Sequence, residues 1–354
     1  MRERAAAATT SFFAKAYSLP LLVAALLVTA WLTHRYSWLN PYQQQILMYV
    51  GINIILTASL NLVNGYMGEF AVGHAAFMAV GAYVSSLITV RVFPYEAAPF
   101  LFPLALVAGA AAAGLVGLLV AFPSFRTRGD YLAIVTLALN MIVKSAIENL
   151  EVIGGPRGFL GMQRLTTLPW VFFWVVVALF VLRNFIHANL GRGVLSIRED
   201  EVAAELLGVN TRRVKLYAFI LSSSLAGLAG GLFAHVVQFI TPRSFDIVRS
   251  TEILVMVYLG GIGSLAGSVL GATIYTVALE WLRFLGQWRM AIAPLLLVML
   301  MILRPTGMMG LREFVALVPR DEQDLRGRLA RMGLAASAPG APGAERKVAP
   351  HGPA

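Results

Sequence analysis

The residue types that support catalysis or metal binding are few and scattered in this sequence. The five histidines lie far apart, no HExxH pair occurs, and the chain contains no cysteine. Zinc sites and thiolate nucleophiles need such groups at short spacings, and an ATP-binding loop needs a GxxxxGK[ST] pattern that this sequence lacks. We therefore expect no enzyme activity, no cofactor, no metal site and no nucleotide site on this chain.

Acidic side chains inside apolar sequence are the other candidates for chemistry, because ion-coupled carriers use such groups near the bilayer midplane. Glu69, Glu148, Glu252 and Glu280 are all expected near the ends of apolar runs. Lys144 is the most deeply placed charge, but its stem can reach the interface, and Glu148 follows one helical turn later. This pattern disfavours an ion-coupled secondary carrier, although glycine-broken runs keep that alternative open.

Membrane helices must position these residues. Of the 354 residues, 58% are hydrophobic and 13% are charged, whereas soluble domains have about 45–50% apolar and about 25% charged residues. Since a bilayer core needs roughly 20 apolar residues per helix, the sequence predicts an all-α, polytopic protein of about 8–10 transmembrane helices. The apolar runs that suggest these spans are 19–32, 46–63, 70–90, 100–122, 131–147, 170–185, 216–237, 253–262, 266–282 and 292–303.

Basic residues indicate the orientation of the predicted spans. Lys and Arg outnumber Asp and Glu by 28 to 18, an excess that is typical of cytoplasmic loops in a membrane protein and gives no reason to expect nucleic-acid binding. Four basic clusters are predicted to be cytoplasmic, at residues 2–15, 126–128, 192–215 and 304–320. Both termini are then cytoplasmic, whether the short run 253–262 crosses at a slant or dips in as a half-helix.

The same pattern predicts the organisation of the chain. The first apolar run lacks a small-residue cleavage site, so we interpret it as an uncleaved span and not as a signal peptide. The predicted parts are a cytoplasmic segment at 1–18, a transmembrane domain at 19–310 and a cytoplasmic tail at 311–354. The tail lacks apolar periodicity and is expected to be disordered.

Glycines mark places where the predicted helices break or approach closely. The run GYMGEFAVGHAAFMAVGAY at 65–83 begins with small and ionisable residues, namely Gly65, Gly68, Glu69, Gly73 and His74. Small residues let helices approach closely, and ionisable residues at a span end can gate a path. We leave open whether Glu69 and His74 serve gating or packing, or are plain interface residues.

Two further glycine-rich stretches have the same character. In EVIGGPRGF at 151–159, the glycines Gly154, Gly155 and Gly158 predict a turn, either as a tight connection or as a docking or gating surface. In GGIGSLAGSVLG at 260–271, which starts with Gly260 and Gly261, the four-residue spacing of Gly263, Gly267 and Gly271 predicts one bare helix face.

The most informative stretch is the polar segment 191–215, GRGVLSIREDEVAAELLGVNTRRVK. Asp200 can cap a helix over 201–207, and Gly208 can end it. The apolar residues that share one face of this helix are Val202, Ala203, Leu206 and Leu207. A short amphipathic helix between two spans suits docking into a groove on a partner, and the alternative is a helix that lies on membrane lipid.

Within this segment, EVAAELLGVN at 201–210 resembles the coupling motif of bacterial ATP-binding cassette importer permeases. The motifs that surround it are the run at 65–83, GDYLAIVTLAL at 129–139, GGPRGF at 154–159 and TEILVMVYLGGIGSLAGSVLGA at 251–272. In order and spacing these are similar to LivM-type permeases of branched-chain amino acid importers. The resemblance covers residues 45–310.

The resemblance implies a function and its partners. A LivM-type permease is expected to lie in the bacterial inner membrane and to form part of the translocation path for branched-chain or related amino acids. It pairs with a LivH-type sister permease, two cytoplasmic ABC ATPases and a periplasmic substrate-binding protein. The residues that then carry the ATPase contact are Glu201, Ala204, Gly208 and Asn210.

Departures from the family pattern concern the substrate. Many relatives have other residues where this chain has Glu69, Ala71, Val72, Asn140 and Met141. The same importer type is expected to act also on urea, amides, or aromatic and carboxylic acids, and these alternatives stay open.

Overall fold

The computed structural model describes residues 40–94, 98–125, 131–283 and 307–310, with isolated positions at 27, 28, 30, 31, 35, 286, 295 and 299. The predicted segment 1–18 and tail 311–354 lie outside the described residues, as do the first and last predicted spans apart from such positions. Within the described residues the chain is helical, and its only β-type pairing is the bridge between Phe159 and Ile240. The predicted all-α fold is confirmed.

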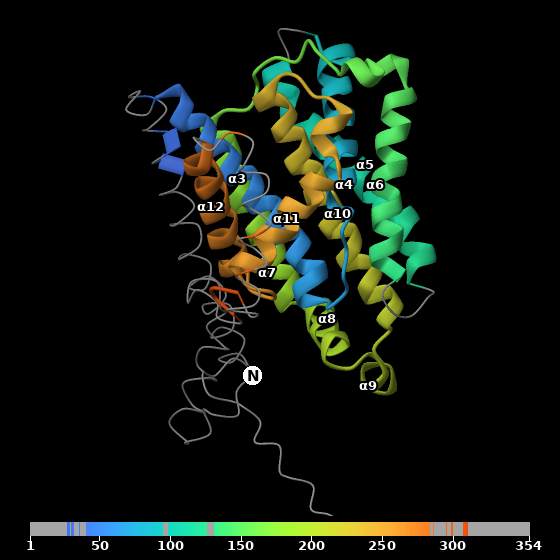
Figure 1. Ribbon diagram of the computed structural model, residues 1–354. Helices are drawn as coiled ribbons and strands as arrows, with labels where there is room; N and C mark the ends of the chain where they lie inside the picture. The colour runs from blue at the N-terminus through green and yellow to red at the C-terminus, as the bar shows by residue number, and fades with distance from the viewer. Residues whose placement is uncertain are drawn as a thin grey trace, which may run out of the picture.

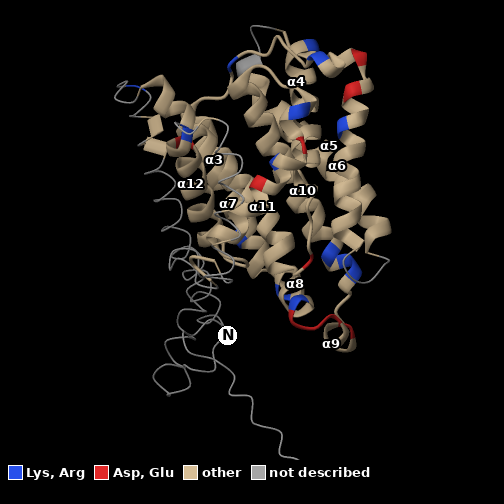
Figure 2. Ribbon diagram, viewed as in Figure 1, with Lys and Arg blue, Asp and Glu red and all other residues tan. Residues whose placement is uncertain are grey.

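Six described helical segments are long and apolar enough to cross a bilayer. They are α3 (Pro41–Asn61) continued by η1 (Leu62–Tyr66), α4 (His74–Leu87) continued by η2 (Ile88–Val92), α5 (Ala98–Ser124), α6 (Tyr131–Asn149), α7 (Leu168–His187) and α10 (Thr211–Val237). Each coincides with a predicted span, and Figure 1 shows them running side by side as a bundle. Most charged residues lie toward the two ends of this bundle, and a few lie between the ends, around α11 (Figure 2).

The remaining elements are shorter. They are η3 (Glu151–Ile153), η4 (Gly155–Arg157), α8 (Asn189–Glu199), α9 (Glu201–Leu206), η5 (Pro242–Phe245), α11 (Ile247–Gly260) and α12 (Leu265–Trp281). At 1.5 Å per residue, α11 and α12 are about 21 and about 26 Å long, less than the bilayer core of about 30 Å. They form an adjacent pair beside α3, joined by the turn 261–264 (Figure 1).

The centre of the bundle is formed by α3 and α10. These two helices are the most buried of the long segments, whereas α6 and α7 lie at the periphery. Close packing of α10 on α4 needs glycine, because a Cβ at Gly230 would collide with the Met78 carbonyl and one at Gly81 with the Gly227 backbone. Such close approach is how membrane helices associate without a hydrophobic driving force between them.

The predicted glycine face at 260–271 is wrong at Gly263. Gly261 (φ 131°) and Gly263 (φ 77°) lie in the turn before α12, in backbone conformations that favour glycine. Gly267 and Gly271 do share a face of α12, and both lie against the backbone of Gly260 on α11. The glycine pattern therefore reflects a tight turn followed by a helix that crosses α11 closely. A four-residue spacing does not show whether a glycine lies in the turn or on the helix face.

We predict that Gly230→Val destabilises the folded chain, because the added side chain meets the Met78 carbonyl. Overpacking of this kind costs about 1–3 kcal/mol. The measurement is the thermal midpoint of the purified protein in detergent, with Ala111→Val on the exposed face of α5 as the control. Equal midpoints for the two variants would contradict the close packing of α4 on α10.

Candidate functional site

The predicted coupling helix exists as α9. Asp200 caps it, since its Oδ1 accepts hydrogen bonds from the backbone N–H groups of Val202 (2.9 Å) and Ala203 (3.0 Å). Gly208, with φ at 85°, follows the end of the helix. Asn210 then caps α10 by accepting a hydrogen bond from the Arg213 N–H at 3.1 Å. These caps confirm the predicted start of α9 and place its end one residue earlier than expected, at Leu206.

One face of α9 is apolar and exposed. Leu206 and Leu207 are 84% and 83% exposed, and Val202 is 56% exposed. A Cβ at Gly208 would meet nothing within 4 Å, so packing within this chain does not require glycine at this position. Ala204 is buried beneath this face, so a partner does not reach it while α9 packs as it does here. We call Val202, Leu206, Leu207 and Gly208 the α9 face.

A second helix precedes α9, and the sequence did not predict it. The structure has α8 at Asn189–Glu199, with Val194 and Ile197 buried against the bundle. Gly191 is required at its start, because a Cβ would collide with the carbonyl groups of Phe185 and Ile186. The three-residue spacing of the apolar residues Val194 and Ile197 could have indicated this helix. The polar residues around them made the helical pattern hard to recognise.

The ammonium group of Lys215 joins the coupling helix to a distant part of the chain. Its Nζ lies 2.6 Å from Oε1 of Glu69 and 2.8 Å from Oε1 of Glu201. The Lys215 side chain is 8% exposed. Glu201 is the first residue of α9, and Glu69 lies in the non-helical segment between η1 and α4, so three elements meet at this group. Glu69 is therefore an ion-pair partner of a buried lysine.

The non-helical segment 67–73, which we call the α3–α4 break, replaces the first part of the predicted span 70–90. Gly68 adopts φ 77° beside Arg198 of α8, and the Arg198 Nη1 donates to the Gly65 carbonyl at 3.4 Å. Gly73 precedes α4, where a Cβ would collide with the Thr136 carbonyl of α6. The glycines thus let the break pass close to two other helices.

His74 begins α4 and is buried. Its Nε2 forms a hydrogen bond with Oγ of Ser59 on α3, at 2.8 Å. Hydrogen bonding satisfies a polar group that burial would otherwise penalise. His74 therefore packs the end of the break against α3.

Asn61 connects the same region to the turn before α12. Its Oδ1 accepts from the Gly263 N–H at 2.8 Å, and its Nδ2 donates to the Ser264 carbonyl at 2.8 Å. Asn61 is completely buried, and a Cβ at Gly65 would collide with its side chain and with the Gly263 backbone. This amide was not predicted, because its partners lie about 200 residues away.

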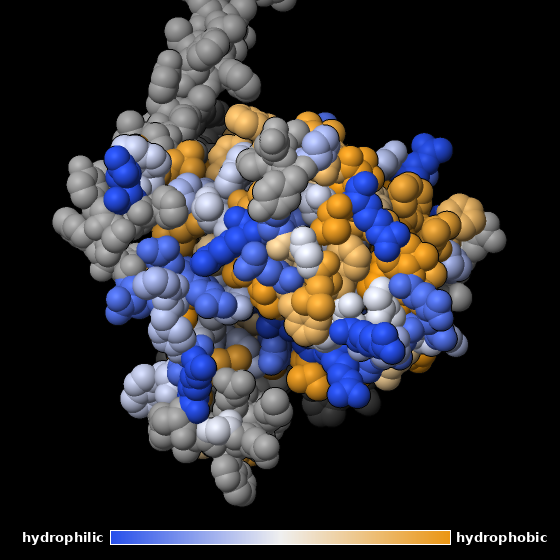
Figure 3. All heavy atoms as spheres, turned by 90° about the horizontal axis from the view of Figure 1, so that it is seen from above, coloured by the Kyte–Doolittle hydropathy of each residue, from blue (hydrophilic) through white to orange (hydrophobic). Residues whose placement is uncertain are grey.

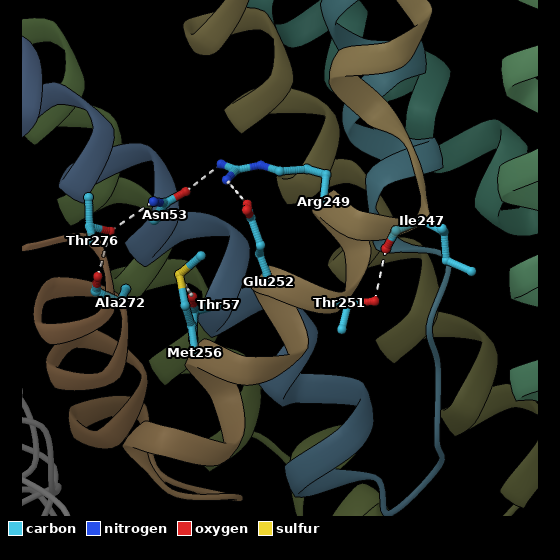
Figure 4. Close-up of polar contacts among 9 residues, drawn as sticks. All are labelled: Asn53, Thr57, Ile247, Arg249, Thr251, Glu252, Met256, Ala272 and Thr276. Atoms are coloured by element: carbon cyan, nitrogen blue, oxygen red, sulfur yellow. Dashed lines mark hydrogen bonds and ion pairs between the residues drawn. The ribbon is translucent and has the colours of Figure 1, made fainter. Parts of the chain in front are cut away.

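A polar cluster lies deeper in the membrane domain (Figure 4). Arg249 Nη1 is 2.7 Å from Oε2 of Glu252, and its Nη2 donates to Oδ1 of Asn53 at 2.6 Å. Asn53 donates in turn to Thr276 Oγ1 at 2.8 Å. Asn53 lies at the middle of the 26-residue segment Pro41–Tyr66, so the prediction that Glu252 lies near a span end is wrong. The sequence argument against an ion-coupled carrier was that all acidic residues lie near span ends, and it does not hold for Glu252.

Lys144 also has a different partner from the predicted one. Its Nζ lies 3.0 Å from Oδ2 of Asp246, which caps α11, and the predicted pairing with Glu148 on the same helix is not found. The hydrogen bond from Lys144 and a second one from the Ile247 N–H hold the pKa of Asp246 below its usual value. No group of three or more potential metal ligands occurs among the residues that the structure describes.

The glycine-rich loop at 151–159 lies at the opposite end of the bundle from α9 (Figure 1). Gly154, Gly155 and Gly158 all have positive φ, and Phe159 exchanges two backbone hydrogen bonds with Ile240. The predicted turn is present, with Gly154 and Gly158 each following a short 3-10 helix. Figure 3 shows this end of the molecule, where hydrophilic residues are interspersed with exposed apolar ones.

Comparison with known proteins identifies the family. The model of a family described as branched-chain amino acid transport system / permease component matches residues 43–304. The chain belongs to this family of permease components. The family is one of transport permeases and not of enzymes, and the six apolar helices agree with a multi-pass membrane protein.

Individual relatives support this membership. The high-affinity branched-chain amino acid transport system permease protein LivM of Escherichia coli is 35% identical over 295 residues, which cover 73% of this chain and 68% of the relative. The LivH permease protein of Salmonella typhimurium is 27% identical over 51% of this chain and 59% of the relative. A probable LivM of Methanocaldococcus jannaschii is 25% identical, covering 66% and 79%. No solved structure matches the chain.

We predict a pH-dependent contribution from the Lys144–Asp246 pair. Because the pKa of Asp246 is lowered in the folded state, the pair stabilises the protein above the usual carboxyl pKa of about 3.9, and this contribution is lost as the pH falls through the folded-state value. Lys144→Gln should cost at most about 1 kcal/mol at pH 7, since both side chains are partly exposed. The thermal midpoints of Lys144→Gln and the unaltered chain are measured from pH 7 down to about pH 2. Their difference should shrink below about pH 3.9 and vanish below the folded-state pKa, and a constant gap would contradict the pairing.

Proposed function

We propose that this chain is the permease subunit of an ATP-binding cassette importer and forms part of the translocation path for branched-chain or related amino acids. The observation that carries the proposal is the capped, exposed α9 helix, tied by Lys215 to the α3–α4 break inside the bundle. The names of the relatives support the same function and substrate class. The bacterial inner membrane is the location that this function implies.

Four partners complete the proposed importer. Two cytoplasmic ABC ATPases supply the energy, and one of them docks on the α9 face. The segment it contacts includes Glu201, Gly208 and Asn210, whereas the buried Ala204 supports α9 from within. A LivH-type sister permease supplies the other half of the path. A periplasmic substrate-binding protein docks at the opposite end, on the surface that includes the 151–159 loop. Both chain termini are then cytoplasmic.

The contacts suggest how movement passes from the ATPases to the membrane domain. Closure of the ATPase dimer pushes on α9, whose first residue, Glu201, is paired with Lys215. The same ammonium holds Glu69 in the α3–α4 break. Asn61 then connects the end of α3 to the turn before α12. A push on α9 thus reaches α3, α4, α10 and α12 through direct contacts.

An ion-coupled secondary carrier is the second candidate, and the Arg249–Glu252 pair is the observation that favours it, because such carriers use intramembrane charges. Reconstitution into liposomes with all five subunits distinguishes the two. The importer takes up branched-chain amino acid only with ATP and the binding protein present. Uptake by this chain alone, driven by an ion gradient, would establish the carrier. The same assay with urea or amides would test the other substrates.

We predict that Leu206→Asp abolishes coupling, because it places a charge in the centre of the α9 face. Binding of the ATPase and amino acid uptake should both fall by about tenfold or more, as expected for a hot-spot residue at an interface. Membrane insertion should be unchanged. The matched control for ATPase binding is Leu160→Asp, an exposed leucine outside α9. Its uptake is not compared, because Leu160 follows the 151–159 loop that is proposed to receive the binding protein. Normal ATPase binding by Leu206→Asp would contradict the assigned surface.

A second prediction is that Gly208→Trp also abolishes uptake. A Cβ at Gly208 meets nothing within 4 Å, so we expect a defect to arise at a partner surface or from the positive φ of this residue. Gly208→Ala, which carries the backbone cost of positive φ without the bulk of Trp, is the control for backbone strain. Uptake should be lost with Trp and largely kept with Ala, and equal loss in both would assign the effect to the backbone.

We predict that Lys215→Met separates ATPase binding from transport. The variant keeps the length of the side chain but removes both ion pairs, so ATPase binding should persist while uptake falls. Arg213→Met, an exposed residue in the same turn of α10, is the matched control. The measurements are co-purification of the ATPases and ATP-driven uptake in liposomes. Full uptake by Lys215→Met would contradict transmission through this group.

A further inference from the structure

The polar cluster on α11 plays no part in the proposed coupling. Arg249 and Glu252 lie one helical turn apart on α11, Asn53 comes from α3 and Thr276 from α12, and their side chains point toward one another (Figure 4). We call these four residues the α11 cluster. It contains one positive and one negative charge and therefore no net charge.

Placing such charges inside a membrane domain is costly. Ionisable residues within transmembrane segments are rare, and they generally face the protein interior or a hydrated path. An apolar pair of similar shape is often as stable as an ion pair or more so, so stability alone does not account for the cluster. Its presence in the middle of the bundle therefore calls for a role in binding.

The side chains of Arg249 and Glu252 are partly exposed, whereas Asn53, which contacts Arg249, is buried. The Arg249 and Glu252 side chains are 20% and 30% exposed, and Asn53 is buried. A guanidinium has five N–H donors, and the contacts with Glu252 and Asn53 use one from each of its two terminal nitrogens. Donors thus remain for a further acceptor. Asn53, fixed by Thr276, holds the guanidinium in place.

The charges of the cluster complement those of an α-amino acid. Such a solute carries a carboxylate and an ammonium group on adjacent positions, and here a cation and an anion lie 2.7 Å apart. Guanidinium groups bind carboxylates through two parallel hydrogen bonds, and a carboxylate accepts from an ammonium. One zwitterionic head group can therefore contact both residues at once.

We propose that Arg249 and Glu252, positioned by Asn53 and Thr276, form a transient binding site for the zwitterionic head group of a small α-amino acid part-way along the path. Arg249 receives the carboxylate and Glu252 receives the ammonium group. The proposal rests on the proposed importer function. It assigns the recognition of the head group to this chain, in addition to any recognition by a binding protein.

The test uses the complete complex in liposomes, with radiolabelled leucine and its binding protein. Arg249→Gln and Glu252→Gln should each lower uptake by about tenfold or more, as expected when a hydrogen bond to a charged group is lost. ATP hydrolysis by the assembled complex should stay close to that of the unaltered complex. The matched control is Arg283→Gln. It removes another Arg–Glu pair at the same three-residue spacing, between Glu280 on α12 and Arg283 just after the end of that helix.

A charge-swapped variant separates recognition from a purely structural pair. Arg249→Glu combined with Glu252→Arg keeps an ion pair on α11 but reverses its direction relative to Asn53. We expect assembly to be kept and uptake to stay low. Restored uptake in the swapped variant would overturn the site, and so would unchanged uptake in Glu252→Gln or Arg249→Gln. If Arg249→Gln does not assemble, the swapped variant is used instead. Low uptake by an assembled swapped complex supports the site, and restored uptake overturns it.

The experiment also distinguishes this inference from the function on which it rests. If the unaltered complex takes up no leucine with ATP and binding protein present, the importer function itself is wrong. If the unaltered complex transports leucine and the two single variants match it, only the site on α11 is wrong.

Discussion

The two ion pairs of Lys215 are the interaction on which the arrangement of the cytoplasmic end depends. Burying an ammonium group is expensive unless it is paired, and here two carboxylates from distant segments provide the compensation. The helix α9 has six residues, too few to be stable alone. Its position therefore relies on the Asp200 cap and on the contact between Glu201 and Lys215. The same ammonium fixes the α3–α4 break.

Close backbone approaches extend this connection into the membrane domain. Gly65 and Gly73 let the residues around the break lie against the turn before α12 and against α6, and Asn61 fastens that turn with hydrogen bonds to its backbone. These contacts connect α9, through Lys215 and the break, to α6 and to the turn before α12. Coupling over a distance needs elements with two alternative arrangements. We infer that the break and the turn 261–264 are those elements.

Local patterns allowed the helices and caps to be predicted, but not the contacts that join them. Apolar runs identified the six long spans, and Asp200 and Gly208 identified the limits of α9, because caps and periodicity act within a few residues. Lys215 and Glu69 are 146 residues apart, and Asn61 and Gly263 are 202 apart, so no spacing signals their pairing. The error at Gly263 has a similar cause, since periodicity does not reveal a positive φ.

The most direct measurement of transmission through Lys215 uses the absence of cysteine from the chain. Spin labels on cysteines introduced at Ala203, an exposed residue of α9 outside the α9 face, and at the exposed Phe70 in the break report the distance between the two elements in the assembled complex. With Lys215 present, the two labels should keep their separation when ATP is added, because the elements move together. With Lys215→Met, ATP should change that separation. An identical response in both proteins would contradict the central claim that this ammonium couples α9 to the break.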